Sequence, residues 1–437
     1  MPDRLAIFGG TPVVEDGITR SWPQVRDDDR QAVLRVLERG RLGGPRAPEA
    51  VALQEEWAAY CGVRHSLATN SGTAALHLAL IAAGVQPGDE VITSAFTFSA
   101  SAHAILHALA IPVFADIDPV TFTMDPALVE ALVTDRTRAI MPVHIHGMPA
   151  DLDPMLDLCR RRGLVLIEDA CQAHGAEYKG RRVGGFGQSA AFSLNFTKSF
   201  PGGEGGLFTT NDDEVERVAD SARVFGEDTR VLDEVLIRPY FSYRIGWNYR
   251  SQELPAALAR AQLAHLDEAN GRAIRNAARL TEGLRGRRGL RPPEVPADRV
   301  STFQKYRVRL LPAELGLDVD PVAFRDRVLV ALRAEGVAAA LWHTKPVPAY
   351  PLFQERAGYG GTMFPWTMPP ASRDVTYDPA GYPETSRLLD ASVLIGSEPQ
   401  PLCAQDLPLM DRYLEAVARV LAAADRLMDV PEEALVR

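Results

Sequence analysis

The chain has 437 residues and a formal net charge of -10, and 46% of its residues are hydrophobic and 24% charged. This length suggests two or three domains, or one large core with an appendage. The acidic balance argues against a general nucleic-acid-binding protein, which would carry a basic patch or stripe. The four cysteines form no C-x-x-C pair, which favours free thiols in a reducing compartment over a disulfide or zinc framework. Without a signal peptide or a long apolar stretch, we expect a cytoplasmic protein that binds no membrane and no metal.

The first 25 residues are expected to form an arm, followed by helices at residues 27–39 and 48–61. Small polar residues, Ser71, Gly72 and Thr73, then lead directly into an apolar helix that runs to about Leu80. This pattern is typical of a capped helix N-terminus. Free N–H groups and the helix dipole would also suit a phosphate there, although a capped helix without a ligand is the commoner case. It is not a Walker loop, because the G-K-[ST] ending is absent.

Strands and helices alternate from residue 90 onward. We expect strands at 90–94, 111–116, 139–144, 164–169, 190–194 and 206–210, and helices at 99–109, 125–133 and 155–162. This order, with nearly continuous apolar strands, predicts an α/β fold with a largely parallel sheet and helices on both faces. Ligands bind beyond the carboxyl ends of such strands. Phe98, His144, Asp169 and the loop around Lys198 all fall at these ends.

The later part of the chain predicts a smaller unit. Residues 253–284 read as one long helix or two stacked ones, and the Gly- and Pro-rich stretch 285–298 marks a boundary. Beyond it we expect strands at 304–311 and 337–343, helices at 321–335 and 408–428, and a long loop at 355–383, of the kind that often carries function. We therefore predict an arm (1–25), a large α/β domain (26–284) and a small C-terminal α+β domain (285–437).

Lys198 stands inside the run F-S-L-N-F-T-K-S-F-P-G-G-E-G-G, residues 192–206. It is one of only four lysines in a chain that takes most of its positive charge from arginine. A lone lysine is usually a solvated surface charge. Here apolar residues precede it, and the following glycines allow backbone to pass close to a ligand. A desolvated lysine can act as a nucleophile, which arginine cannot.

Together these pieces suit pyridoxal 5′-phosphate (PLP). Lys198 would form a Schiff base with the aldehyde, and Asp169 would keep the pyridine nitrogen protonated. Phe98 would stack on the ring, and the helix start at Gly72 would bind the phosphate. The protein's task is then to position and tune the cofactor, which serves as the electron sink. For two of these residues an interpretation without a cofactor stays open: Asp169 could be paired with an arginine, and Phe98 could be buried in the core.

Six motifs, in this order, resemble the DegT/DnrJ/EryC1/StrS family, the sugar and cyclitol aminotransferases of PLP fold type I. They are N-S-G-T-A-A-L, G-D-E-V-I-T, I-E-D-A-C-Q-A-H-G, F-S-x-x-x-T-K, G-E-G-G and G-W-N-Y-R-S-Q-E-L-P-A-A-L, and they lie between residues 69 and 258. Each motif alone is weak evidence, whereas the ordered set is specific.

The resemblance implies a role for each matching residue. Lys198 is the catalytic residue, which carries the Schiff base and moves the proton. The cofactor-binding set is Gly72, Thr73, Phe98, Asp169, Gln172, Ser193, Lys198 and Asn248. Asn248 matches an asparagine that reaches the phosphate of the neighbouring subunit, which implies a homodimer with shared active sites. Candidate pocket-wall or substrate residues are His144, His146, His174, Asn195, Arg250 and His343, with Arg250 suited to a donor carboxylate. The histidines could equally be satisfied core residues.

The implied activity is transfer of an amino group from L-glutamate or L-glutamine to a ketone on a cyclitol or a nucleotide-linked sugar, in aminosugar or antibiotic biosynthesis. Pro348 stands where many sugar-specific members carry a histidine, and the stretch 356–388 is longer than in simple nucleotide-sugar members. The stretch is more similar to the scyllo-inosose aminotransferases, near which the aminohydroxybenzoate synthases belong. A PLP-dependent dehydratase and a non-catalytic regulatory protein are the alternatives. Lys198 weighs against the dehydratases, since those most similar to this family replace the lysine with histidine.

Overall fold

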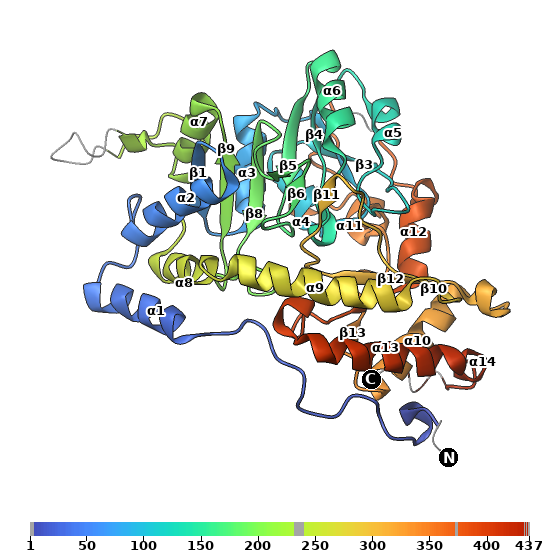
Figure 1. Cartoon of the computed structure of the whole chain (residues 1–437). Coiled ribbons are helices and arrows are strands. Elements are labelled where there is room, and N and C mark those ends of the chain that lie inside the picture. The colour runs from blue at the N-terminus through green and yellow to red at the C-terminus, as the bar shows by residue number, and fades with distance from the viewer. Residues whose placement is uncertain (1–3, 231–239, 372–374, 432, 434, 436–437) are drawn as a thin grey trace.

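The computed structural model describes the whole chain except residues 1–3, 231–239, 372–374, 432, 434, 436 and 437 (Figure 1). A seven-stranded sheet with the order β1-β9-β8-β5-β4-β2-β3 forms its centre. The strands are β1 (His65–Thr69), β2 (Glu90–Ser94), β3 (Ile111–Ala115), β4 (Thr137–Met141), β5 (Val165–Asp169), β8 (Ser189–Ser193) and β9 (Gly206–Thr210). Strand β9 runs antiparallel to both of its neighbours, and the other pairs in this sheet are parallel. The predicted α/β class with a mostly parallel sheet is confirmed.

Helices cover both faces of this sheet. One face packs against α2 (Pro48–Cys61), α6 (Leu152–Arg162) and α8 (Glu253–Leu263). The other face packs against α3 (Gly72–Ala82), α4 (Ala100–His107) and α7 (Asp213–Arg223). Because both faces are buried, the strands are apolar on both sides and show no alternation with polar residues.

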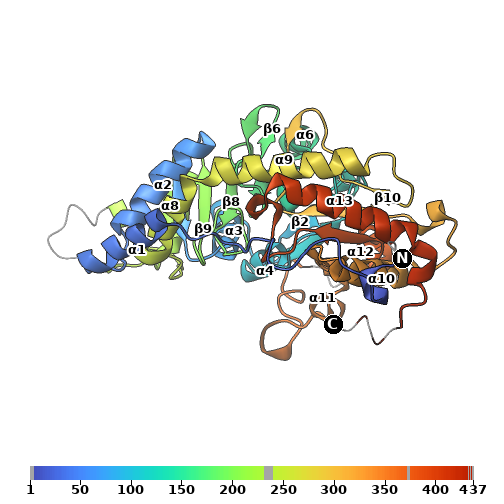
Figure 2. The ribbon, with the colours of Figure 1, turned by 60° about the horizontal axis from the view of Figure 1, so that its bottom comes forward.

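A second core is built on a four-stranded antiparallel sheet with the order β10-β12-β14-β13. Its strands are β10 (Leu290–Arg291), β12 (Tyr306–Leu310), β13 (Ala339–Ala340) and β14 (Ser392–Ile395). The helices α9 (Leu266–Leu284), α10 (Pro321–Ala334) and α13 (Leu407–Ala422) share this core with Leu5, Val13 and Val14 of the arm. Figure 2 shows α13 lying alongside α9. Helix α9 thus packs in the second core although it precedes the predicted boundary, and the division into domains stays a prediction.

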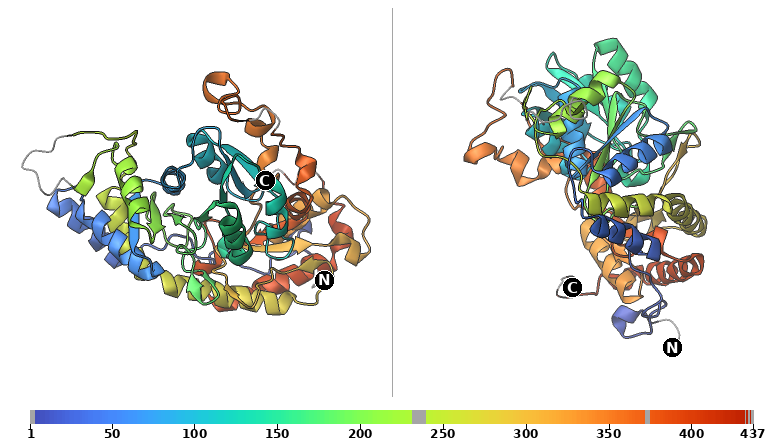
Figure 3. Two further views of the ribbon diagram at one scale, coloured as in Figure 1. Left: turned by 90° about the horizontal axis from the view of Figure 1, so that it is seen from above. Right: turned by 90° about the vertical axis from the view of Figure 1, so that its left-hand side faces the viewer.

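The N-terminal arm is a connecting segment. It leaves α1 (Asp27–Arg39) and runs beneath the molecule to the second core (Figure 1). On the same side, α8 and α9 follow one another in an arc (Figure 3). The prediction left one or two helices open at residues 253–284, and the structure has two, since the helix is interrupted at Ala264 and His265.

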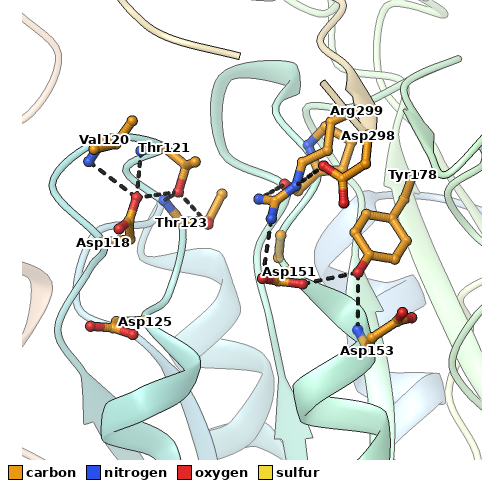
Figure 4. Close-up of polar contacts among 12 residues, drawn as sticks. Asp118, Val120, Thr121, Thr123, Asp125, Asp151, Asp153, Tyr178, Asp298 and Arg299 are labelled. Atoms are coloured by element: carbon orange, nitrogen blue, oxygen red, sulfur yellow. Dashed lines mark hydrogen bonds and ion pairs between the residues drawn. The ribbon is translucent and has the colours of Figure 1, made fainter. Parts of the chain in front are cut away.

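A separate three-stranded sheet pairs the segment after α9 with the segment after β5, and polar contacts beside it are drawn in Figure 4. It consists of β6 (Glu177–Tyr178), β7 (Arg181–Arg182) and β11 (Arg299–Val300). The Tyr178 hydroxyl donates to Asp151 Oδ1 at 2.9 Å, and the Arg299 guanidinium lies 3.2 Å from the same carboxylate. Nearby, Asp118 Oδ1 accepts from the N–H groups of Val120 and Thr121 and closes a turn. These acids therefore serve the fold, and the described residues contain no group of three or more His, Cys, Asp or Glu side chains that could hold a metal ion.

Three local predictions are corrected. Strands β1 and β14 were not predicted. Each has only four or five residues, and neither stands in the stretch where strands and helices alternate clearly in the sequence. The strand predicted at 337–343 is reduced to β13, and His343 has a φ of 59°, which lies outside the strand region. The helix predicted at 125–133 is short, with α5 at Pro126–Val129 followed by a 3-10 turn at Glu130–Leu132.

Two predictions from composition can be compared with the structure. All four cysteines are free, as predicted. In the part of the chain that the structure describes, no helix has both the length and the apolar character that crossing a membrane requires.

Candidate active site

A cavity of about 350 Å³ lies beyond the carboxyl ends of β5 and β8. The large sheet and its helices supply most of the wall, and the second core contributes Trp342 and Glu398. Eight of the fourteen residues predicted for the site line it: Gly72, Thr73, Phe98, Asp169, Gln172, Ser193, Asn195 and Lys198. Parallel strands bring these residues together because their carboxyl ends meet at one edge of the sheet.

Lys198 lies in the loop between β8 and β9. Its backbone N–H donates to Asn195 O, and its carbonyl accepts from the Trp22 indole, both at 2.9 Å. Burial lowers the pKa of the Lys198 amine, while the nearby carboxylates of Asp169 and Glu398 act in the opposite direction. The neutral, nucleophilic form is therefore more accessible than in an exposed lysine.

Asp169 ends β5 and is 4% exposed. Its Oδ2 accepts from the Ser101 hydroxyl at 2.6 Å, and its Oδ1 accepts from the Cys171 N–H at 3.2 Å. Among the described residues no arginine or lysine pairs with it at salt-bridge distance, so the alternative of an arginine partner is not what the structure shows. Its charge faces the cavity, where it can stabilise a protonated ring nitrogen.

The start of α3 forms the opposite end of the cavity. Ser71 caps the helix, with its hydroxyl accepting from Ala74 N at 3.1 Å. The N–H groups of Gly72 and Thr73, the first two of the helix, have no partner within the helix and can hold an anion. A Cβ at Gly72 would lie 2.9 Å from Ser193 Cβ and 3.0 Å from Cys171 Sγ. Glycine is therefore required for this close approach, and the residues fit a phosphate group.

Gln172 is oriented from behind the cavity. Its Oε1 accepts from the backbone N–H of His146 at 2.9 Å and lies 3.3 Å from His146 Nδ1. Burial lowers the pKa of His146 well below its usual range, so the ring is neutral. Because Arg307 Nε donates to His146 Nε2 at 3.3 Å, the ring proton is on Nδ1 and is donated to Gln172. The amide nitrogen of Gln172 is then left as the donor that faces the cavity.

Phe98 is not a core residue, since its side chain is 51% exposed in the cavity wall. Asn195 lies across the cavity. Its Nδ2 donates to Glu204 Oε1 at 2.7 Å and its Oδ1 accepts from the Thr197 hydroxyl at 2.8 Å.

None of the four predicted histidines is part of the cavity lining, and His146 lies behind Gln172, as described above. His144 is fully buried, with Nε2 3.1 Å from Glu168 Oε2 and Nδ1 accepting from Ala150 N. His174 lies among aromatic rings, and burial lowers its pKa to about 3. His343 lies behind Trp342, and its Nδ1 is 2.6 Å from the Tyr350 hydroxyl. His144 and His174 are both core residues, but only His144 is satisfied there, since neither ring nitrogen of His174 has a hydrogen-bond partner among the described residues.

Asn248 and Arg250 also lie outside this lining. The Asn248 side chain is exposed and its carbonyl accepts from Asn70 Nδ2 at 3.2 Å. The Arg250 guanidinium lies 5.2 Å from the centre of the Phe225 ring. The predicted role of Asn248 toward a neighbouring subunit and that of Arg250 toward a donor carboxylate stay predictions.

Sequence reasoning missed several cavity residues, among them Thr97, Ser101, Glu204, Trp342 and Glu398. Thr97 and Ser101 follow β2, and the Thr97 hydroxyl lies 2.7 Å from that of Ser101, which holds Asp169. Their signal was the small polar residues around Phe98. Trp342 and Glu398 carry no local signal, because only the docking of the second core brings them to the cavity.

Within one cavity the chain therefore combines an amine of lowered pKa, a strand-end carboxylate and an open helix start. This set, on a mostly parallel sheet with a second α+β core, defines a PLP-dependent aminotransferase of fold type I. The DegT/DnrJ/EryC1/StrS aminotransferase family model matches residues 23–378. The chain belongs to this family.

Curated relatives match over most of the chain. A proposed L-glutamine:3-amino-2,3-dideoxy-scyllo-inosose aminotransferase of Streptoalloteichus tenebrarius is 36% identical, over 98% of this chain and 100% of the relative. The L-glutamine:2-deoxy-scyllo-inosose aminotransferase of the same organism is 39% identical, over 74% of this chain and 81% of the relative.

Solved structures show the same fold. A 3-amino-5-hydroxybenzoic acid synthase superposes with a TM-score of 0.80 and 29% identity, over 92% of this chain and 98% of that chain. Streptomyces venezuelae DesV, solved with a ketimine intermediate, gives a TM-score of 0.75 and 31% identity, over 93% of this chain and 100% of that chain.

Proposed function

We propose that this aminotransferase moves the amino group of L-glutamine to a ketone on a cyclitol ring. The observation that carries the proposal is the match to a relative named for this donor and acceptor class, which covers 98% of this chain and 100% of the relative. The cavity is consistent with a hydroxyl-rich acceptor, since Thr97, Asn195 and Glu204 line it with polar groups. L-Glutamate as donor and a nucleotide-linked keto-sugar as acceptor are the competing choices.

The residues of the chain divide the work. PLP, when bound, supplies the electron sink for the carbon that loses a proton. Lys198 Nζ holds the cofactor between turnovers and carries the proton to and from the substrate carbon. Asp169 stabilises the protonated ring nitrogen, Gln172 donates to the ring hydroxyl, and the start of α3 binds the phosphate. Because both half-reactions use the same groups, ping-pong kinetics are expected.

The test follows the visible absorbance of the PLP-loaded protein. L-Glutamine should bleach the band in the absence of acceptor, and a keto-cyclitol such as 2-deoxy-scyllo-inosose should then restore it. Bleaching by L-glutamate alone, or restoration only by a nucleotide-linked keto-sugar, would replace the donor or the acceptor named here. A band that no amino donor bleaches would favour elimination chemistry or a regulatory role.

We also propose a homodimer in which Asn248 completes the phosphate site of the partner. Its exposed side chain, away from the cavity of its own chain, supports this arrangement. Lys198→Ala and Asn248→Ala proteins can be mixed under exchange conditions. If Asn248 acts across the interface, one site of each mixed dimer is fully native, and activity should rise above that of either variant. Activity that stays at the Asn248→Ala level would place the residue in its own subunit's site.

A further inference from the structure

The charges that line the cavity pose a problem for an amino-acid donor. Among the described residues, the lining contains three carboxylates, of Asp169, Glu204 and Glu398, and one amine, that of Lys198. An amino-acid donor brings a further carboxylate, and Lys198 is occupied by the chemistry. Because a desolvated charge without a partner is costly, the donor carboxylate needs another cation. The acceptor of the proposed function carries no carboxylate and must be accepted by the same site.

Lys305 is a cation directly behind the cavity wall: it is not part of the lining, but it contacts the lining residues Glu398 and Trp342. It precedes β12 directly, its side chain is only 5% exposed, and its Nζ lies 2.9 Å from Glu398 Oε1. Glu398 lies in the loop after β14, lines the cavity and keeps 46% of its side chain exposed. A buried cation thus meets a carboxylate that borders both the cavity and solvent.

Trp342 holds the buried cation on a second side. Lys305 Nζ lies 5.6 Å from the centre of the Trp342 ring, which also lines the cavity. A cation over an indole face is stabilised when it is shielded from water. The ammonium therefore keeps one stabilising contact when its carboxylate partner changes.

The wall behind these residues has more positive than negative charge. Arg307, 2% exposed, donates to His146 Nε2, Ser392 Oγ and the Trp342 carbonyl, which are all neutral groups. Arg307 thus adds a second buried positive charge to this wall, and among the described residues Glu398 is the one carboxylate at salt-bridge distance from Lys305. Burial lowers the pKa of Lys305 to about 8, although Glu398 opposes this. A carboxylate next to Lys305, whether from Glu398 or from a ligand, therefore stabilises the protonated amine.

We propose that Lys305 binds the α-carboxylate of the amino donor, and that Glu398 returns to Lys305 when the acceptor, which has no carboxylate, is in the cavity. The inference rests on the proposed function, because it pairs Lys305 with the donor carboxylate in the first half-reaction and with Glu398 in the second. A cation without an internal partner would be left unpaired whenever the acceptor is bound. The exchange keeps Lys305 paired in both stages, and the displaced Glu398 turns toward solvent. No bond is made or broken in this step.

The test uses Lys305→Met and Glu398→Gln in the full-length, PLP-loaded protein. The rate of bleaching is measured against L-glutamine concentration, or L-glutamate if only that donor bleaches the wild type. Lys305→Met should weaken the apparent Kd for the donor by about 10- to 100-fold, the range of a charged hydrogen bond. Glu398→Gln removes the competing carboxylate and should tighten the same Kd severalfold. The limiting rate should change by less than about threefold in both, because neither residue touches the reacting atoms.

Opposite shifts in Kd separate this role from a structural salt bridge, whose loss from either side would act in one direction. Lys179→Met is the matched control, since it removes an exposed ion pair with Asp153 away from the cavity. The compound 4-aminobutanamide, which is glutamine without its α-carboxylate, supplies a second readout. Wild type should prefer L-glutamine over it at least tenfold, and Lys305→Met should lose most of that preference.

The inference is overturned if both variants shift the donor Kd in the same direction, if neither shifts it, or if the preference over 4-aminobutanamide survives in Lys305→Met. Lys305→Arg keeps the charge and should retain most of the preference, which guards against misfolding of the methionine variant. A wild-type band that no amino donor bleaches would overturn the proposed function and this inference with it. Bleaching in the wild type with unchanged variants would overturn the inference alone.

Discussion

The two walls of the cavity hold their charged and polar groups in different ways. On the wall from the large sheet, each group has fixed partners within the fold: Ser101 holds Asp169, and His146 holds Gln172. On the wall from the second core, Glu398 is half exposed and pairs with the buried Lys305. In our proposal, Glu398 releases this partner to the donor carboxylate. Rigid partners suit steps common to both half-reactions, whereas an exchangeable partner suits the choice between two unlike substrates.

The N-terminal arm joins these walls. The Trp22 indole N–H donates to the Lys198 carbonyl at 2.9 Å, and its backbone N–H donates to Pro399 O at 2.8 Å, next to Glu398. One residue thus connects the loop of the reactive lysine with the loop of the exchangeable carboxylate. The contrast between the walls can be tested by changing each wall and then the link.

The largest effect is expected from Lys198→Ala on the rigid wall. Turnover should fall by at least about 10⁴-fold, because the variant loses both the nucleophile and the proton carrier. The visible band of the bound cofactor should also disappear. Steady-state rates and absorbance spectra provide the measurement, with Lys179→Ala as the control. Full turnover in Lys198→Ala would remove the basis for assigning the chemistry to this wall.

Gly72→Ala should weaken cofactor binding by about tenfold, the effect of forcing a methyl group into a filled space. The added Cβ would lie within 3.0 Å of Cys171 Sγ, so the start of α3 must move away from the phosphate position. PLP affinity can be measured by absorbance titration of the apoprotein. Gly381→Ala is the control, since a Cβ there meets no atom within 4 Å. Unchanged affinity in Gly72→Ala would show that this wall is less rigid than the contacts indicate.

Trp22→Phe should lower kcat about fivefold, in proportion to one lost hydrogen bond of about 1 kcal/mol. The ring remains, so the packing of the arm is largely kept while the link to Lys198 is cut. Trp366→Phe loses a comparable indole hydrogen bond, to the Tyr377 hydroxyl, away from the cavity. That control should lose stability but keep kcat. Equal kinetic effects in both variants would argue against a specific link between the walls.

The smallest effect concerns the pH dependence of the apoprotein. Burial lowers the pKa of Lys198 below the ordinary 10.5, so the unfolded chain binds this proton more tightly than the folded one. The free energy of unfolding should therefore rise with pH between the two pKa values. Urea unfolding of wild type and Lys198→Met across alkaline pH would measure it, and the rise should be smaller in the variant. Parallel curves for the two proteins would contradict a desolvated amine.

Local sequence was sufficient for one wall of the site. The start of a helix is defined by its first residues, Ser71, Gly72 and Thr73. Asp169 marks the end of an apolar strand, and Lys198 stands beside a glycine cluster. Each of these signals depends on neighbours in the chain, through capping or strand periodicity. The large sheet could be predicted for the same reason, apart from β1, whose five residues carry too little pattern.

The other wall was decided by tertiary structure. Trp342, Glu398 and Lys305 stand in unremarkable sequence. Only the packing of α9, α10 and α13 on the second sheet brings Trp342 and Glu398 to the cavity, with Lys305 paired to Glu398 behind them. Tertiary structure also decided the role of His144. Histidine is a common active-site residue, but this one hydrogen-bonds with Glu168 and Ala150 in the core. Sequence thus determined the residues whose role follows from local backbone geometry. Burial and long-range pairing, which depend on how distant segments pack, decided which polar groups reach the cavity and which are used by the fold.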